Sequence, residues 1–134
     1  MRLLKPLEVI WIHDDCISPP GPKMVVCVEA RLGFFFRINT RPNWQQSLFL
    51  KKGPDHPFLH HDSYLECGDP LELDEYVIEQ SLDEKGVIGT VSQALIPDIL
   101  EAVRTASRMS EKDKRTIAMF LDPGGVHLPT RGEE

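Results

Sequence analysis

The sequence predicts a mainly β protein with a C-terminal helix, built as one small domain around a curled antiparallel sheet. Its 134 residues are 41% hydrophobic and 27% charged, which is an ordinary composition for a globular domain. In the first part of the chain, short apolar segments alternate with clusters of Pro and Gly, a pattern typical of strands joined by turns. In the last third, apolar residues recur at steps of three and four, which indicates helices.

The first predicted strands are apolar segments rich in β-branched and aromatic residues, beginning with Leu7–Ile12. Lys23–Glu29 is apolar almost throughout, which predicts a strand buried on both faces. Phe34–Ile38 follows after the short connection Ala30–Gly33, so these two strands are expected to form a hairpin. Weaker patterns predict further strands at Ser47–Leu50, Asp62–Cys67 and Tyr76–Ser81.

The strand expected at Asp62–Cys67 alternates along its length. One face is predicted to carry Ser63, Leu65 and Cys67, and the other Tyr64 and Glu66. Five or six short strands with Pro/Gly turns indicate a small curled sheet, and an SH3-like barrel with a C-terminal helix fits the order of the segments and the chain length.

The helical part begins near Ser92, which is a suitable N-cap for the apolar stripe Leu95–Val103. Pro97 is tolerated only in a first helical turn, so the regular helix is expected to begin close to it. Ser110 predicts the start of a second helix, which Pro123-Gly124-Gly125 ends.

We therefore expect a single barrel domain over residues 1–122 and a flexible tail over 123–134. Fifteen Lys and Arg against twenty-one Asp and Glu give a net charge of -6, which argues against nucleic-acid binding by bulk charge but leaves room for a small basic groove. No apolar run approaches the roughly 20 residues of a membrane span, and no signal peptide is recognisable, so a cytoplasmic protein without a membrane partner is predicted. Three cysteines without a C-x-x-C pair argue against a disulfide framework or a zinc finger, and Cys27 is interpreted as a buried, inert thiol.

Several short motifs follow one another in a familiar order. They are an opening strand (Glu8–Ile12), a Gly/Pro loop before an apolar strand (Met24–Val28), a second apolar strand ending in a hydroxyl residue (Phe34–Thr40), an Asp-Ser step (His61–Leu65) and a Gly-containing stretch that leads into a helix (Val87–Ser92). In this layout the chain resembles the MazF/PemK-like toxins over residues 7–105. The resemblance implies an SH3-like barrel that forms a homodimer and acts on single-stranded RNA as a metal-independent endoribonuclease, with no cofactor and with an antitoxin protein as its partner.

The resemblance also implies two catalytic positions. One is a basic residue, usually Arg, at the start of the second strand, and the other is a Thr or Ser at the end of the third. Thr40 matches the second position, whereas the first falls on Pro22 or Lys23, depending on the register, and no Arg is present there. Lys23 and Thr40 are therefore the candidate catalytic residues. A lysine binds phosphate as a point charge and orients it less well than the planar guanidinium of arginine.

Other residues around these two are candidates for RNA binding. Arg37 and Arg41 flank Thr40 and, together with Lys23, could form a local phosphate-binding patch. Trp44 is a candidate platform for stacking a single-stranded base, and His61 is a candidate for an acid/base or contact role.

Two other functions stay open at this point. A non-catalytic barrel that acts as a protein-interaction module would agree with the missing Arg and the acidic net charge. A metal-dependent hydrolase could be built on His60, His61 and Asp62, although no third ligand has a clear position. His13–Cys16 is interpreted as a polar turn and the acidic stretch Glu66–Glu84 as mostly a solvated face. The ribonuclease interpretation depends on whether the amino group of Lys23 and the hydroxyl of Thr40 meet at one pocket.

Overall fold

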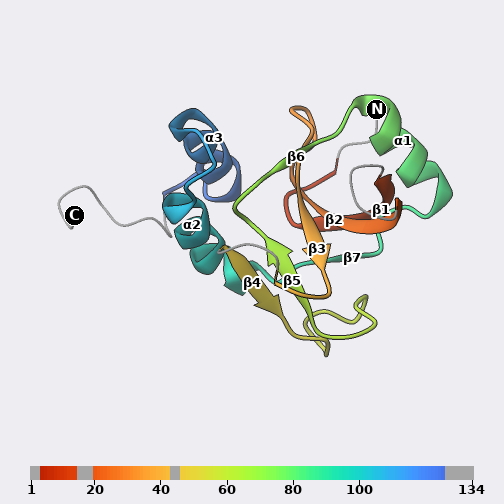
Figure 1. The fold of residues 1–134 in the computed structure, drawn as a ribbon. Helices are drawn as coiled ribbons and strands as arrows, with labels where there is room; N and C mark the ends of the chain where they lie inside the picture. Colours follow the sequence, from red (N-terminus) through yellow and green to blue (C-terminus); the bar gives the residue numbers. More distant parts are fainter. Residues whose placement is uncertain (1–3, 15–19, 43–45, 126–134) are drawn as a thin grey trace.

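The computed structural model describes residues 4–14, 20–42 and 46–125 of the chain. The strands within these ranges are β1 (Glu8–Asp14), β2 (Gly21–Glu29), β3 (Phe34–Asn39), β4 (Ser47–Leu50), β5 (Ser63–Glu66), β6 (Leu71–Glu72) and β7 (Gly89–Thr90). They form one curled sheet in the order β4-β5-β3-β2-β1-β7, with β6 paired to β3, and the paired strands are antiparallel (Figure 1). The predicted mainly β class with a C-terminal helix is confirmed.

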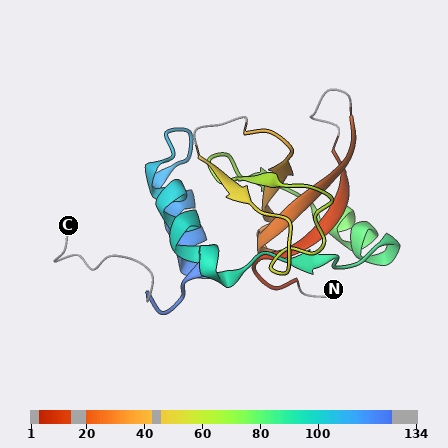
Figure 2. The same cartoon turned by 90° about the horizontal axis from the view of Figure 1, so that it is seen from below.

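Helices cover both faces of this sheet. α2 (Ile96–Thr105) and α3 (Glu111–Leu121) lie on one side, and α1 (Glu75–Glu84) lies on the opposite side (Figures 1 and 2). Two buried clusters match this arrangement; their sheet residues include Val9, Val26, Phe36, Ile38 and Leu65 on the α2/α3 face, and Ile10, Ile12, Val25, Cys27 and Phe35 on the α1 face. The two faces of β2 thus contribute to two different cores.

The predicted hairpin of β2 and β3 is confirmed, and four successive residues of β2, Val25–Val28, are buried. The continuous apolar run in the sequence predicts this burial on both faces of the strand. The turn between the strands depends on Gly33, which has a φ of +70°. A Cβ on this residue would lie 2.1 Å from the carbonyl oxygen of Leu73, so the turn requires glycine.

The prediction of a strand at Tyr76–Ser81 is wrong, because these residues belong to α1. The Asp74 side chain caps this helix by accepting a hydrogen bond from the Val77 N–H. Ile78, Ser81 and Leu82 are the buried residues of the helix and recur at the spacing of one helical face, whereas Tyr76 is exposed. The cap and this spacing outweigh the weak strand preference of the segment.

The helix starts in the last third agree with the sequence. Ser92 caps a short 3₁₀ turn (Gln93–Leu95), and α2 follows with Pro97 in its first turn, where its missing N–H is not needed. Ser110 accepts a hydrogen bond from the Asp113 N–H at the start of α3. The tail expected from residue 123 lies, from residue 126 onward, outside the described residues.

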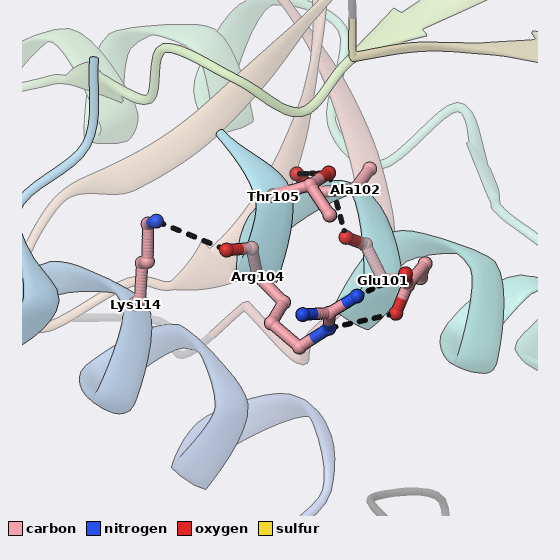
Figure 3. A network of polar contacts seen from close by, with 5 residues as sticks. All are labelled: Glu101, Ala102, Arg104, Thr105 and Lys114. Atoms are coloured by element: carbon pink, nitrogen blue, oxygen red, sulfur yellow. Dashed lines mark hydrogen bonds and ion pairs between the residues drawn. The ribbon is translucent and has the colours of Figure 1, made fainter. Parts of the chain in front are cut away.

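A network of polar contacts lies at the end of α2 and includes one hydrogen bond from α3 (Figure 3). The Nζ of Lys114 donates a hydrogen bond of 3.0 Å to the carbonyl oxygen of Arg104, one of the last carbonyls of α2. The Arg104 guanidinium pairs with Glu101 one turn earlier, and the Thr105 hydroxyl donates to the Glu101 carbonyl over 3.0 Å. Lys114 therefore satisfies one of the carbonyls that the helix end leaves without an intrahelical partner.

Candidate functional site

The register of the β2–β3 hairpin decides where the candidate catalytic residues point. Next to the turn, Glu29 pairs with Phe34, and this register alone would bring Lys23 opposite Thr40. A β-bulge between Cys27 and Glu29 shifts the pairing by one residue, so that Val25 pairs with Arg37. Continued along both strands, the shifted register brings Lys23 opposite Asn39.

Because side chains alternate between the faces of a sheet, this register fixes the face on which Lys23 lies. Lys23 is two residues from Val25 and therefore shares the α1 face with Arg37. Thr40 follows directly after Asn39, the last residue of β3, and lies in a bend where the alternation of a strand no longer fixes the direction of a side chain. The register therefore sets the face of Lys23 but does not by itself place the Thr40 hydroxyl relative to the Lys23 ammonium.

On the α1 face, Lys23 belongs to a charged cluster with Asp14, Arg37 and Glu66. The Nε of Arg37 donates a hydrogen bond of 2.8 Å to Oδ2 of Asp14, and the Asp14 side chain is only 3% exposed. Glu66 is buried on β5, where its two carboxylate oxygens lie 2.7 and 2.8 Å from the hydroxyl of Ser47 on β4. Two cations and two buried carboxylates therefore meet at one end of the sheet.

The electrostatic state of Lys23 reflects this cluster. Burial lowers the pKa of its ammonium, and Arg37 lowers it further, whereas Asp14 and Glu66 act in the opposite direction. The loss of hydration is the largest of these effects, so the two carboxylates do not fully compensate for it. The charged form of Lys23 is half-buried and therefore lowers the free energy of unfolding.

The sequence interpretation missed the burial of these two carboxylates. Asp14 is not part of a polar turn but the last residue of β1, and Glu66 is the buried exception in an acidic stretch that is otherwise mostly exposed, as predicted. For Glu66 the sequence held one usable signal, which was its place inside a predicted strand instead of in a loop. The bulge between Cys27 and Glu29 left no recognisable mark in the sequence.

Thr40 instead lines a small cavity of about 160 Å³ at the same end of the sheet. We call it the histidine cavity, and its walls are formed by Trp11, Pro22, Lys23, Met24, Ile38, Asn39, Thr40, His60, His61 and Ser63. His60 and His61 lie in a bend before β5 and are exposed. Neighbouring residues of a strand would point to opposite faces, whereas the bend allows both histidines to line one cavity. Lys23, Thr40 and His61, three of the predicted site residues, are therefore neighbours of this cavity.

The hydrogen bonds of His61 define which of its ring nitrogens can accept a proton. Nδ1 lies 3.1 Å from the Asp62 carbonyl oxygen, which can only accept a hydrogen bond. In the neutral ring Nδ1 therefore carries the hydrogen, and Nε2 has the lone pair. The Ser63 hydroxyl, which donates to the His61 carbonyl over 3.1 Å, holds the same bend in place.

Of the other residues predicted to bind RNA, Arg37 and Arg41 do not line the histidine cavity. Arg37 is engaged by Asp14 in the charged cluster, and Arg41 is exposed just after Thr40. Trp44 lies outside the described residues. Trp11, which the sequence interpretation missed, is instead the described tryptophan at this end of the sheet, and it lines the histidine cavity.

The hypothesis of a metal site on His60, His61 and Asp62 gains no support from the described residues. Among them, no group of three or more His, Cys, Asp or Glu side chains is arranged to hold a metal ion.

Within the described ranges, no helix combines the length and the apolar character that a membrane crossing requires.

Comparison with models of known protein families, with curated proteins and with solved structures finds no match for this chain. The resemblance to the MazF/PemK-like toxins therefore remains a prediction from the order of the short motifs in the sequence.

Proposed function

We propose that this protein binds single-stranded RNA at the histidine-cavity end of the sheet and cleaves it without a metal ion. The observation that supports this most directly is the cavity itself, which combines two exposed imidazoles with the Thr40 hydroxyl and has Lys23 in its wall. Cleavage through the 2′-hydroxyl of RNA needs a base, an acid and donors that offset the charge of the phosphorane. Imidazoles suit both proton transfers near neutral pH.

The His61 Nε2 takes the proton of the 2′-hydroxyl, because its Nδ1 is committed to the Asp62 carbonyl. The freed 2′-oxygen attacks the phosphorus, and the bond from phosphorus to the 5′-oxygen breaks. His60, in its protonated form, gives its proton to that leaving oxygen. The products are a 2′,3′-cyclic phosphate and a 5′-hydroxyl end, and proton exchange with water restores both imidazoles.

Donors around the cavity hold the phosphate during this step. The Thr40 hydroxyl is exposed at the cavity and donates to a phosphate oxygen. Lys23, in the wall of the same cavity, and the nearby Arg37 contact a neighbouring phosphate of the strand, and Asp14 and Glu66 position these cations. Arg41 adds an exposed cation after Thr40. This division of roles differs from a Lys23–Thr40 pair that acts on one phosphate.

The fold type and the partners complete the proposal. The order of the strands and the late helices agree with an SH3-like barrel of the MazF/PemK type. The homodimer and the antitoxin protein remain predictions from the sequence resemblance.

The test is cleavage of a single-stranded RNA oligonucleotide in EDTA, with identification of the new ends. Wild-type protein is expected to form 2′,3′-cyclic phosphates, and His61→Gln and His60→Gln to lower the rate by about 10²- to 10⁴-fold. Thr40→Val is expected to lower it by about 10²-fold, the usual effect of losing one donor to the transition state. Arg31→Gln, a change in the exposed β2–β3 turn, serves as the control and should leave the rate unchanged.

The separate values of kcat and KM provide a second measurement. His61→Gln and His60→Gln are expected to lower kcat more than they raise KM, because the imidazoles act on the proton transfers of the chemical step. Intact RNA after incubation with the wild type, or an unchanged rate for His61→Gln, would refute the proposal.

A further inference from the structure

A second cavity, of about 450 Å³, lies at the edge of the sheet beside the histidine cavity. We call it the edge cavity; it is lined by β1 residues including Trp11 and Ile12, by Pro22 of β2 and by α1 and its C-terminal end, including Gln80, Glu84 and Lys85. β7 pairs with β1 only at Glu8 and Val9, so it does not cover this part of β1. The cavity is therefore a groove between the uncovered end of β1 and α1.

Trp11 joins the two cavities. Trp11 and Pro22 line both of them, so these two residues form their common wall. The indole ring of Trp11 is only partly buried, and the Nζ of the exposed Lys85 lies 5.5 Å from its centroid. An accessible indole beside a flexible ammonium is a suitable surface for a flat, electron-rich ring with a phosphate attached.

The charge of the edge cavity selects which part of a nucleotide it can hold. α1 carries an acidic side chain into the cavity at Glu84, and a phosphate placed against that carboxylate would be repelled. A neutral base would not be repelled. Ile12, which lines the cavity, pairs directly with Lys23, so the sugar-phosphate chain of a bound nucleotide can leave the cavity towards cations.

The hydrogen-bonding groups of the cavity narrow the choice of base. The Glu84 carboxylate has two oxygens that only accept hydrogen bonds at neutral pH. Of the four RNA bases, guanine presents two adjacent donors, N1–H and the N2 amino group, which match a carboxylate in a bidentate manner. Gln80 supplies a further amide donor and acceptor from the same helix.

We propose that the edge cavity is a guanine-binding subsite, in which the base stacks on Trp11 and donates two hydrogen bonds to Glu84. The proposal rests on the proposed function, because it makes the edge cavity the base-recognition site next to the cleavage site. Lys85 leaves the indole ring when the base binds and pairs with the phosphate of the same nucleotide.

The test uses the fluorescence of Trp11. The chain has two tryptophans, Trp11 and Trp44, so the Trp44→Phe variant leaves Trp11 as the single indole reporter. This variant is titrated with the 5′-monophosphates of guanosine, adenosine, cytidine and uridine. Saturable quenching is expected, with guanosine monophosphate bound at least about 10-fold more tightly than the other three.

Matched variants separate base recognition from general binding. In the Trp44→Phe background, Glu84→Gln is expected to remove the preference for guanosine monophosphate, whereas Glu75→Gln at the exposed start of the same helix should retain it. Lys85→Met should weaken all four mononucleotides by a similar factor. Equal binding of the four nucleotides, or no change in Trp11 fluorescence with any of them, would overturn the guanine subsite.

These outcomes are independent of cleavage, since a mononucleotide contains no phosphodiester bond between nucleosides. Guanosine monophosphate binding together with intact RNA would refute the ribonuclease while supporting the subsite. RNA cleavage without guanosine preference, and unaffected by Glu84→Gln, would refute the subsite alone. If both proposals hold, Glu84→Gln should raise KM for guanine-containing RNA with little change in kcat.

Discussion

Arg37 of β3 and Asp14 of β1 are joined across β2 by a hydrogen bond of 2.8 Å between Nε and Oδ2. The two residues belong to strands that do not pair with each other, so this contact connects both outer neighbours of β2 at the end of the sheet that carries the candidate site. The carboxylate is almost fully buried and the guanidinium is partly exposed. The pair therefore both holds this end of the sheet and sets the position of a cation.

Removing the carboxylate should cost stability. Asp14→Asn removes the charge of the carboxylate that is hydrogen-bonded to the partly buried guanidinium, and we expect the free energy of unfolding to fall by about 1–3 kcal/mol. Urea denaturation measures this change. Asp55→Asn, at an exposed position, is the control and should change the stability by less than about 0.5 kcal/mol. A loss of similar size in both variants would show that the ion pair contributes little.

Removing the charge of Lys23 should not cost stability, in contrast to removing that of Asp14. Burial lowers the pKa of its ammonium, so the folded state binds this proton less tightly than the unfolded state does. The resulting loss of stability is fully present below the folded pKa and disappears as the pH rises towards 10.5, the ordinary value. Lys23→Met should therefore be at least as stable as the wild type near pH 7 while it weakens RNA binding.

The check on Lys23 is the difference in free energy of unfolding between wild type and Lys23→Met, measured from pH 7 to pH 10.5. This difference should move in favour of the wild type as the pH rises. Groups common to both proteins cancel in the comparison. A wild type that loses stability relative to Lys23→Met over this range would contradict the prediction.

The cysteines in the two cores should be chemically inert in the folded protein. Burial, together with the nearby Glu29 and Glu8, raises the pKa of the Cys27 thiol to about 12, and burial also raises the pKa of Cys67. Because only the thiolate reacts, neither should be labelled by iodoacetamide at pH 8 until the chain unfolds. The experiment uses a Cys16→Ser variant, with urea-unfolded protein as the positive control.

The same shift predicts a loss of stability in alkali. Because the Cys27 pKa is raised in the folded state, the protonated thiol contributes to the free energy of unfolding. This contribution is fully present below the ordinary pKa of 9.0 and decreases as the pH rises from 9.0 towards 12. Cys27→Ala should show a weaker decrease over that range in denaturation experiments. Identical pH profiles for the two proteins would contradict the assignment.

His56 should be structural, in contrast to His60 and His61. It is buried, its Nδ1 lies 3.1 Å from the Lys51 carbonyl oxygen, and its Nε2 accepts a hydrogen bond of 3.1 Å from the Ser92 N–H. His56→Leu leaves both backbone groups without this partner, and about 1–3 kcal/mol of stability should be lost. His60→Leu, at an exposed position, is the matched control, for which thermal denaturation should show little change.

Much of this protein is determined locally by its sequence. The apolar run of β2 indicated burial on both faces, and Ser92, Pro97 and Ser110 indicated where the late helices begin, because caps and proline act within a single turn. Only the tertiary structure decided that Asp14 and Glu66 are buried, and that the bulge at Cys27 and Glu29 shifts the pairing of β2 with β3 by one residue. Burial and strand register depend on which segments pack together, and a one-residue shift reverses every side chain beyond it, so neither can be derived from neighbouring residues alone.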